Sequence, residues 1–181
     1  LEQSVAGTWE TGIRGAAGRA SWNLSAFTTT IADDIIFVSS GTLRGEGHFE
    51  NVERTRRRGV EGSFDYRIQN RLLAFCSYSW QRATFRTDLR IASPFHPLAV
   101  DSEIQVMPGD RLPGVPAHSA KLALTGFVTT GLDVGISVRA QSGQYLRGDE
   151  ANLLSTLPAF AVVDAQARQR ITKRLTAVVQ V

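Results

Sequence analysis

The sequence has a single cysteine, Cys76, so it forms no internal disulfide and offers no second thiol for a metal site or a redox pair. Its three histidines, His48, His96 and His118, lie far apart and have no partner at metal-ligand spacing. The motifs G-x-S-x-G and H-E-x-x-H and a glycine-rich phosphate loop are also missing. We therefore expect no enzymatic activity, no catalytic residue, no cofactor and no metal site.

Long apolar runs are missing too. No stretch approaches the roughly 18 apolar residues of a membrane-spanning helix. This absence is compatible with a soluble protein and with a membrane β-barrel, because a barrel strand turns only every second side chain toward lipid. The first residues, LEQSVAGTWETG, have neither a basic start nor an apolar stretch before a cleavage site, so no export signal is expected within them.

Charge of one sign is scarce. The formal net charge is only +3, and the basic residues are scattered apart from Arg54 and the run Arg56–Arg58. A nucleic-acid partner would need a broader basic surface, so none is expected. The arginine run has two interpretations, a solvated charge patch or a contact with anionic lipid of the outer leaflet.

The pattern that is present is alternation. About eight segments alternate apolar and polar residues over roughly ten positions each, which is the period of a β-strand. A strand that crosses a tilted membrane barrel needs about 9–11 residues. The clearest segments are Arg19–Thr30, Val60–Ile68, Leu132–Ala140 and Val162–Ile171. The pattern predicts an all-β fold, an antiparallel up-and-down meander of about eight strands that forms part of a transmembrane β-barrel.

The alternation also predicts which face meets lipid. A charged side chain at the bilayer midplane would cost about 2–4 kcal/mol, so the charged face is expected to line the interior. That face carries Glu10, Arg14, Asp65, Arg67, Lys121, Asp133, Arg139, Asp164, Arg168 and Arg170. The opposite face is expected to contact outer-membrane lipid through Trp22, Leu24, Phe64, Tyr66, Tyr78, Trp80, Leu122, Val134, Ile136, Val138 and Val163.

Short turns and long loops alternate along the chain. Short turns are expected at Gly15–Gly18, Gln69–Asn70, Thr130–Gly131 and Thr172–Arg174. Long loops are expected at Ser39–His48, Arg86–Ala117 and Leu146–Phe160, and the second of these holds five of the six prolines and shows no strand period. In outer-membrane barrels the short turns are periplasmic and the long loops face outward. Trp9 and Trp22 are then expected near the first periplasmic turn, and Tyr78 and Trp80 near the outer interface.

Several stretches resemble the barrel of TonB-dependent outer-membrane receptors, in particular those of the ferric-siderophore type. They are TWETGIRG, FENVERTRRRGVEGSFDYRI, LLAFCSYSWQRATF, MPGDRLPGVPAHSAKLAL, GISVRAQSGQY and GDEANLLSTLPAFAVVDAQARQRITKRLTAVVQV, which together cover nearly the whole chain. The resemblance implies a location in the bacterial outer membrane. It also implies uptake of siderophore-bound iron or a similar small ligand, energised through the TonB complex.

The resemblance further implies that residues 1–181 are the later part of such a barrel. The family's plug domain, its TonB-contacting segment and its last strand are not recognised in this sequence. For ligand recognition we single out cationic and aromatic residues of the outer loops, because an anionic iron chelate suits charge and stacking contacts. These candidates are Arg44, His48, Phe95, His96, Tyr145 and Arg147.

Two other classes of protein stay open at this point. An autonomous eight-stranded membrane barrel, acting as an adhesin or structural protein, has enough strands to close a sheet. A soluble β-sandwich binding module would instead bury the apolar face between two sheets.

Overall fold

The computed structural model describes residues 1–39, 46–69 and 71–181. The chain forms ten β-strands: β1 Val5–Ala17, β2 Ala20–Ser39, β3 Gly47–Ile68, β4 Leu72–Phe85, β5 Leu89–Ala92, β6 Glu103–Val106, β7 His118–Phe127, β8 Leu132–Gln141, β9 Phe160–Arg170 and β10 Thr176–Gln180. Within the described ranges no helix is long and apolar enough to cross a membrane.

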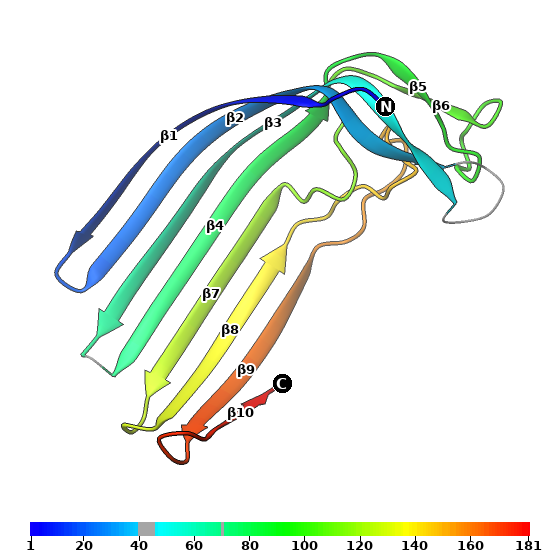
Figure 1. Ribbon diagram of the computed structural model, residues 1–181. Helices are drawn as coiled ribbons and strands as arrows, with labels where there is room; N and C mark the ends of the chain where they lie inside the picture. The colour runs from blue at the N-terminus through cyan, green and yellow to red at the C-terminus, as the bar shows by residue number, and fades with distance from the viewer. Residues whose placement is uncertain (40–45, 70) are drawn as a thin grey trace.

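One curved sheet dominates the molecule (Figure 1). Its eight strands lie in the order β1-β2-β3-β4-β7-β8-β9-β10, and every neighbouring pair is antiparallel. The strands β5 and β6 pair only with each other. The predicted meander is confirmed. Figure 1 also shows the short turns together at the lower left end of the sheet and β5 and β6 at the opposite end.

The register of the strands shows which residues share a face of the sheet. Trp22 lies opposite Phe64, Phe64 opposite Cys76, Cys76 opposite Leu122, and Leu122 opposite Val138. Directly opposed residues of antiparallel strands share a face. The same ladders place every residue predicted to face lipid on one side of the sheet, and the predicted interior charges lie on the other side.

Among the described residues, no second layer covers the apolar side of the sheet. Leu24, Tyr78, Leu122 and Ile136 are exposed on it. A β-sandwich would have buried these side chains, so the sandwich interpretation is wrong. The sheet order also runs from β1 to β10 without a ladder between them in the described residues, so the sheet is open rather than a closed eight-stranded barrel.

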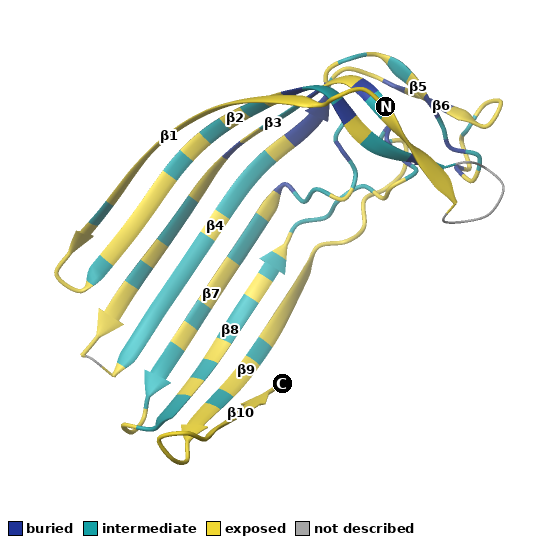
Figure 2. Ribbon diagram, in the orientation of Figure 1, coloured by how far each residue is buried: buried dark blue, intermediate teal, exposed yellow. Residues whose placement is uncertain are grey.

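Strands β2 and β3 are much longer than a membrane crossing requires. They contain 20 and 22 residues, whereas a tilted crossing needs about 9–11. Each of them is therefore about twice as long as one membrane crossing. Figure 2 shows the buried residues collected at the end of the sheet opposite the short turns. The core there contains Val38, Val52 and Phe85, packed with Ile91 of β5 and Ile104 of β6.

A left-handed residue marks the start of this extension. Asp33 has a φ of 53°. Thr55 lies opposite Ile31 in the ladder and donates a hydrogen bond of 2.6 Å to Asp34 Oδ2. The side chains of Ile31 and Asp34 therefore lie on the same face, although strict alternation would place them on opposite faces. The change of alternation at Asp33 turns Val38 into the core of the extension.

Three sequence expectations need correction. The first turn is not Gly15–Gly18, because β1 continues through Ala17 and Gly18 takes the left-handed φ of 59°. The range Arg86–Ala117 is not a plain loop, since it contains β5 and β6, each of only four residues. Trp9 lies opposite Thr28, in the row of Arg58, and therefore near the outer interface rather than near the first turn. Asn70, half of the second predicted turn, lies outside the described residues.

Candidate ligand-binding site

The candidate site is a cavity at the outer end of the sheet, formed by three parts of the chain that are distant in sequence. The end of β2 contributes Phe37 and Val38, β5 contributes Ile91, and the connection after β8 contributes Leu146 and Leu154. The cavity has a volume of about 500 Å³. Its wall combines these apolar groups with polar and charged ones, as in pockets for small ligands.

His96 and Asp149 join the two outer connections. His96 Nε2 lies 3.2 Å from Asp149 Oδ1, and both side chains are buried. The other ring nitrogen, Nδ1, accepts a hydrogen bond of 3.1 Å from the backbone N–H of Leu98. Because Nδ1 is an acceptor, the proton lies on Nε2, which donates to the carboxylate. This geometry makes His96 a positioning residue of the cavity wall.

Asp149 also organises the segment that follows it. Its carboxylate accepts hydrogen bonds from the backbone N–H groups of Leu153, at 2.7 Å, and Leu154, at 3.1 Å. Ser93 supplies a second joint, donating a hydrogen bond of 2.6 Å to the carbonyl oxygen of Gly148. The two connections are therefore held together before any ligand binds.

Asn152 makes a third joint. It adopts a left-handed φ of 54°, accepts a hydrogen bond of 2.6 Å from the backbone N–H of Arg111 and donates one of 3.0 Å to the Arg111 carbonyl. Its side-chain amide thus pairs with the backbone of Arg111 as a neighbouring strand would. Arg111 in turn bridges to Thr84 at the end of β4.

Glu150 is the titratable group of the cavity wall with a clear shift. Burial raises its pKa, and the nearby charge of Asp149 acts in the same direction. The hydrogen bond from the backbone N–H of Gly148 to Glu150 Oε1, at 3.0 Å, opposes this rise in pKa without cancelling it. The structure thus places a poorly hydrated carboxyl group beside the ligand space.

The cavity gathers part of the predicted ligand set. Phe95, His96 and Arg147 line it. His48 lies opposite Val38 in the ladder and is exposed, and Tyr145 lies outside the lining, its carbonyl accepting a hydrogen bond from Gly114. Arg44 is outside the described residues. The sequence reasoning missed Ser93, Asp149, Glu150 and Asn152. The only sequence signal for Asp149, Glu150 and Asn152 is the polar cluster GDEAN, which does not reveal its partners, and Ser93 has no such signal.

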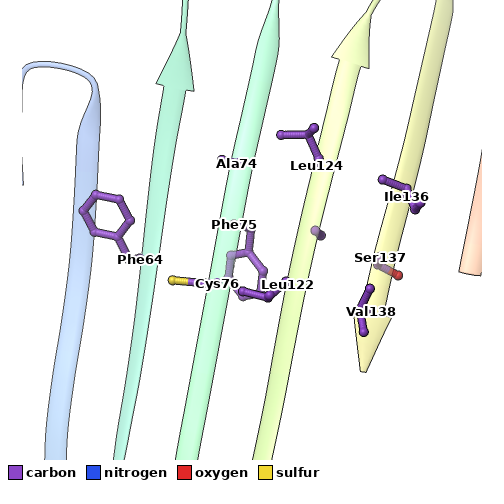
Figure 3. Close-up of a pocket in the computed structure, with 10 residues that line it drawn as sticks. Phe64, Ala74, Phe75, Cys76, Leu122, Leu124, Ile136, Ser137 and Val138 are labelled. Atoms are coloured by element: carbon purple, nitrogen blue, oxygen red, sulfur yellow. The ribbon is translucent and has the colours of Figure 1, made fainter. Parts of the chain in front are cut away.

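Two further surfaces belong to the sheet itself. On the apolar side, Phe64, Cys76, Leu122 and Val138 lie in one row across four strands and border a shallow depression (Figure 3). On the opposite side two ion pairs join neighbouring strands. Arg139 binds Asp164 at 3.0 Å, and Arg168 binds Asp133. The contact of the apolar side with lipid stays a prediction.

The family model described as TonB dependent receptor-like, beta-barrel matches residues 2–181. Three solved structures are similar over nearly the whole chain. The copper transporter OprC has a TM-score of 0.68 at 16% identity, covering 97% of this chain and 24% of its own. The siderophore receptor PiuA from Acinetobacter baumannii has a TM-score of 0.67 at 19% identity, and the match covers 97% of this chain and 23% of PiuA. The ferric yersiniabactin uptake receptor FyuA from Yersinia pestis has a TM-score of 0.68 at 18% identity, and the match covers 98% of this chain and 24% of FyuA.

The chain therefore spans about a quarter of the length of these structures. Identities this low establish a shared fold, here the open meander with its short turns at one end and long connections at the other. The family model spans almost every residue and carries the assignment further. The chain belongs to the TonB-dependent receptor-like β-barrel family, whose members are receptors and transporters of the bacterial outer membrane and not enzymes.

Proposed function

We propose that residues 1–181 form part of the wall and of the outer ligand vestibule of a receptor that takes up siderophore-bound iron or a similar small chelate, energised through TonB. The observation that supports this most is the cavity at the outer end of the sheet. Its walls come from separate connections that are already joined through His96, Asp149 and Ser93. A rigid wall lowers the entropy cost of binding a ligand.

The open sheet supports a wall rather than a complete barrel. β1 and β10 lie at the two ends of the strand order. Unpaired strand edges are costly in hydrocarbon because their N–H and C=O groups find no water, so both edges need neighbouring strands. We place those strands, the plug domain and the TonB-contacting segment outside residues 1–181.

The chemistry of the cavity suits a chelate of negative charge with flat organic groups. Arg147 offers a guanidinium group, which binds carboxylates and other oxyanions through paired hydrogen bonds. Phe95 and Phe37 offer aromatic faces. His48 and Tyr145 stay candidates outside the cavity lining, and Arg44 stays a candidate outside the described residues. OprC, a copper transporter, is a reason to test a bare metal ion beside the iron chelates.

The proposal is tested by binding of ferric enterobactin and of Cu²⁺ to the full-length protein in detergent. Arg147→Ala is expected to weaken binding of the ferric chelate about tenfold or more, because a charge-assisted hydrogen bond is lost. Arg90→Ala is the matched control. It removes an exposed arginine of β5 that pairs with Gln105, away from the cavity lining.

Equal losses for both variants, or no loss for Arg147→Ala with a chelate that binds, would exclude this cavity as the binding site. Binding of Cu²⁺ alone would replace the iron chelate with a metal ion as the substrate. Uptake of the same iron complex by cells that lack TonB would contradict the energised mechanism.

A further inference from the structure

A group of arginines lies on the lipid-facing side of the sheet, above its apolar band. Arg58 and Arg82 are directly opposed on β3 and β4, and Arg56 lies opposite Thr84. Arg86 continues the ladder through a backbone hydrogen bond of 3.0 Å to the Arg54 carbonyl. These residues alternate in phase with Val60 and Trp80, so they share the outward face. We refer to Arg56, Arg58, Arg82 and Arg86 as the outer arginine patch.

The patch begins where the apolar side chains end. Val60 and Trp80 form the last apolar pair of β3 and β4, and Arg58 and Arg82 form the next outward pair. Trp9 lies opposite Thr28 in the row of Arg58, and tryptophan collects at the membrane–water interface. The patch is therefore level with the headgroups of the outer leaflet and outside the membrane-spanning segments.

The charges of the patch are not neutralised by the protein. Among the described residues no arginine of the patch has a carboxylate oxygen within 4.0 Å. The positive charge of Arg86, then burial and the charge of Arg58, lower the pKa of Arg56. Like charges directly opposed in a sheet are destabilising. Arg57, on the other face, does have a partner, Asp34 at 3.5 Å.

Hydroxyl groups complete the anion-binding character of this surface. Thr28 lies opposite Arg58 and Thr30 lies opposite Arg56, and both threonines are exposed, whereas Thr84 on the other side of Arg56 is buried. Hydroxyl groups can donate to a phosphate oxygen while guanidinium groups bind it in a bidentate manner. The same face continues into exposed apolar side chains, which a soluble anion would leave unused.

We propose that the outer arginine patch binds the phosphorylated headgroup of an anionic lipid of the outer leaflet, whose acyl chains lie along the apolar face below it. The phosphate supplies the negative charge that the protein does not. The acyl chains cover the row of Phe64, Cys76, Leu122 and Val138 in Figure 3.

The test uses the full-length protein in a neutral detergent, titrated with diphosphoryl lipid A and followed by native mass spectrometry. Replacing all residues of the patch with glutamine is expected to weaken binding roughly a hundredfold, since each arginine near an anionic lipid surface contributes to attraction. The matched control replaces Arg19, Arg71, Lys173 and Arg174 with glutamine. These residues lie at the short-turn end, and the control removes the same charge.

Two further measurements identify the source of the phosphate. Lipid A without phosphate groups is expected to bind the native protein as weakly as diphosphoryl lipid A binds the glutamine variant. Inorganic phosphate at the same concentration as diphosphoryl lipid A is expected not to compete with that lipid. Undiminished binding to the glutamine variant, an equal loss in the control, equal binding of the phosphate-free lipid or competition by inorganic phosphate would each overturn the proposal.

A lysine version of the patch protects the test against misfolding. Heat-modifiable migration on a gel reports folding of each variant. Lysine keeps the charge and loses the bidentate geometry, so the folded lysine variant is expected to bind with intermediate affinity. Affinity of the lysine variant equal to that of the native protein would contradict a site built on guanidinium geometry.

Discussion

Glu150 has a buried carboxyl group on the wall of the outer cavity. Burial is the largest cause that raises its pKa above the ordinary value of 4.5. The folded segment therefore holds this proton more tightly than the opened segment does. The stabilising contribution is fully present below pH 4.5 and is lost as the pH rises through the folded-state pKa. Neutral pH loosens this part of the cavity wall.

Replacing Glu150 with glutamine should remove this pH dependence, because the amide stays neutral. Hydrogen exchange of residues 146–154 in the full-length protein, corrected for the intrinsic exchange rate, measures the local free energy of opening. In the native protein it should fall as the pH rises from about 4.5, and in Glu150→Gln it should stay level. The exposed Glu103 of β6 gives the control Glu103→Gln. A slope that survives in Glu150→Gln would assign the titration to another group.

At the scale of elements, the connection after β8 is attached to the end of β4 through Arg111 and Asn152. The Asn152 side chain makes two hydrogen bonds to the Arg111 backbone from a left-handed conformation. Either the backbone conformation or the two bonds could be the reason for asparagine here. Glycine distinguishes them, because it adopts this φ without strain and makes neither bond.

Asn152→Gly is expected to lower the local free energy of opening by about 1–3 kcal/mol, since a partly buried donor and acceptor of Arg111 lose their partners. Asn152→Asp keeps the acceptor for the Arg111 N–H and should fall between. Hydrogen exchange of residues 109–112 and 149–154 measures both. Protection in Asn152→Gly equal to that of the native protein would assign asparagine to backbone conformation alone.

Elements differ in how far the sequence predicts them. The wall strands follow from alternation, because an apolar face and a charged face require different side chains at successive positions, as in Leu132–Gln141. β5 and β6 have only four residues each, too few for a period to be visible, and they are held by the core around Phe85. The joint between His96 and Asp149 spans 53 positions, and no local pattern encodes it.

For the candidate site, the sequence predicted the types of side chain better than their positions in the cavity. Phe95 and Arg147 were chosen as aromatic and cationic loop residues, and they share a cavity only because the two connections fold onto each other. Glu150 could not be predicted, since its shift depends on burial by tertiary packing. Asp33 likewise reverses the alternation of β2 through its backbone conformation, which an apolar–polar pattern does not report.

At the scale of the whole molecule, the sheet separates two environments within one residue of chain. Ile136 lies in the middle of β8, exposed on the apolar face opposite Leu124 and Ala165. Ser137, the next residue, lies opposite Ala123 and Asp164 on the face that carries the ion pair of Arg139. The strands β3, β7 and β9 repeat this division, so the faces of the sheet decide where a charge is tolerated.

Ile136→Arg should therefore destabilise the folded protein in lipid vesicles by about 2–4 kcal/mol, because the guanidinium group would meet hydrocarbon. Ser137→Arg, one position away, adds the same side chain to the charged face beside Asp164 and should change stability far less. Guanidinium unfolding of the full-length protein in phosphatidylcholine vesicles measures both free energies. Equal destabilisation, or a larger loss for Ser137→Arg, would mean that the apolar side of the sheet does not face lipid.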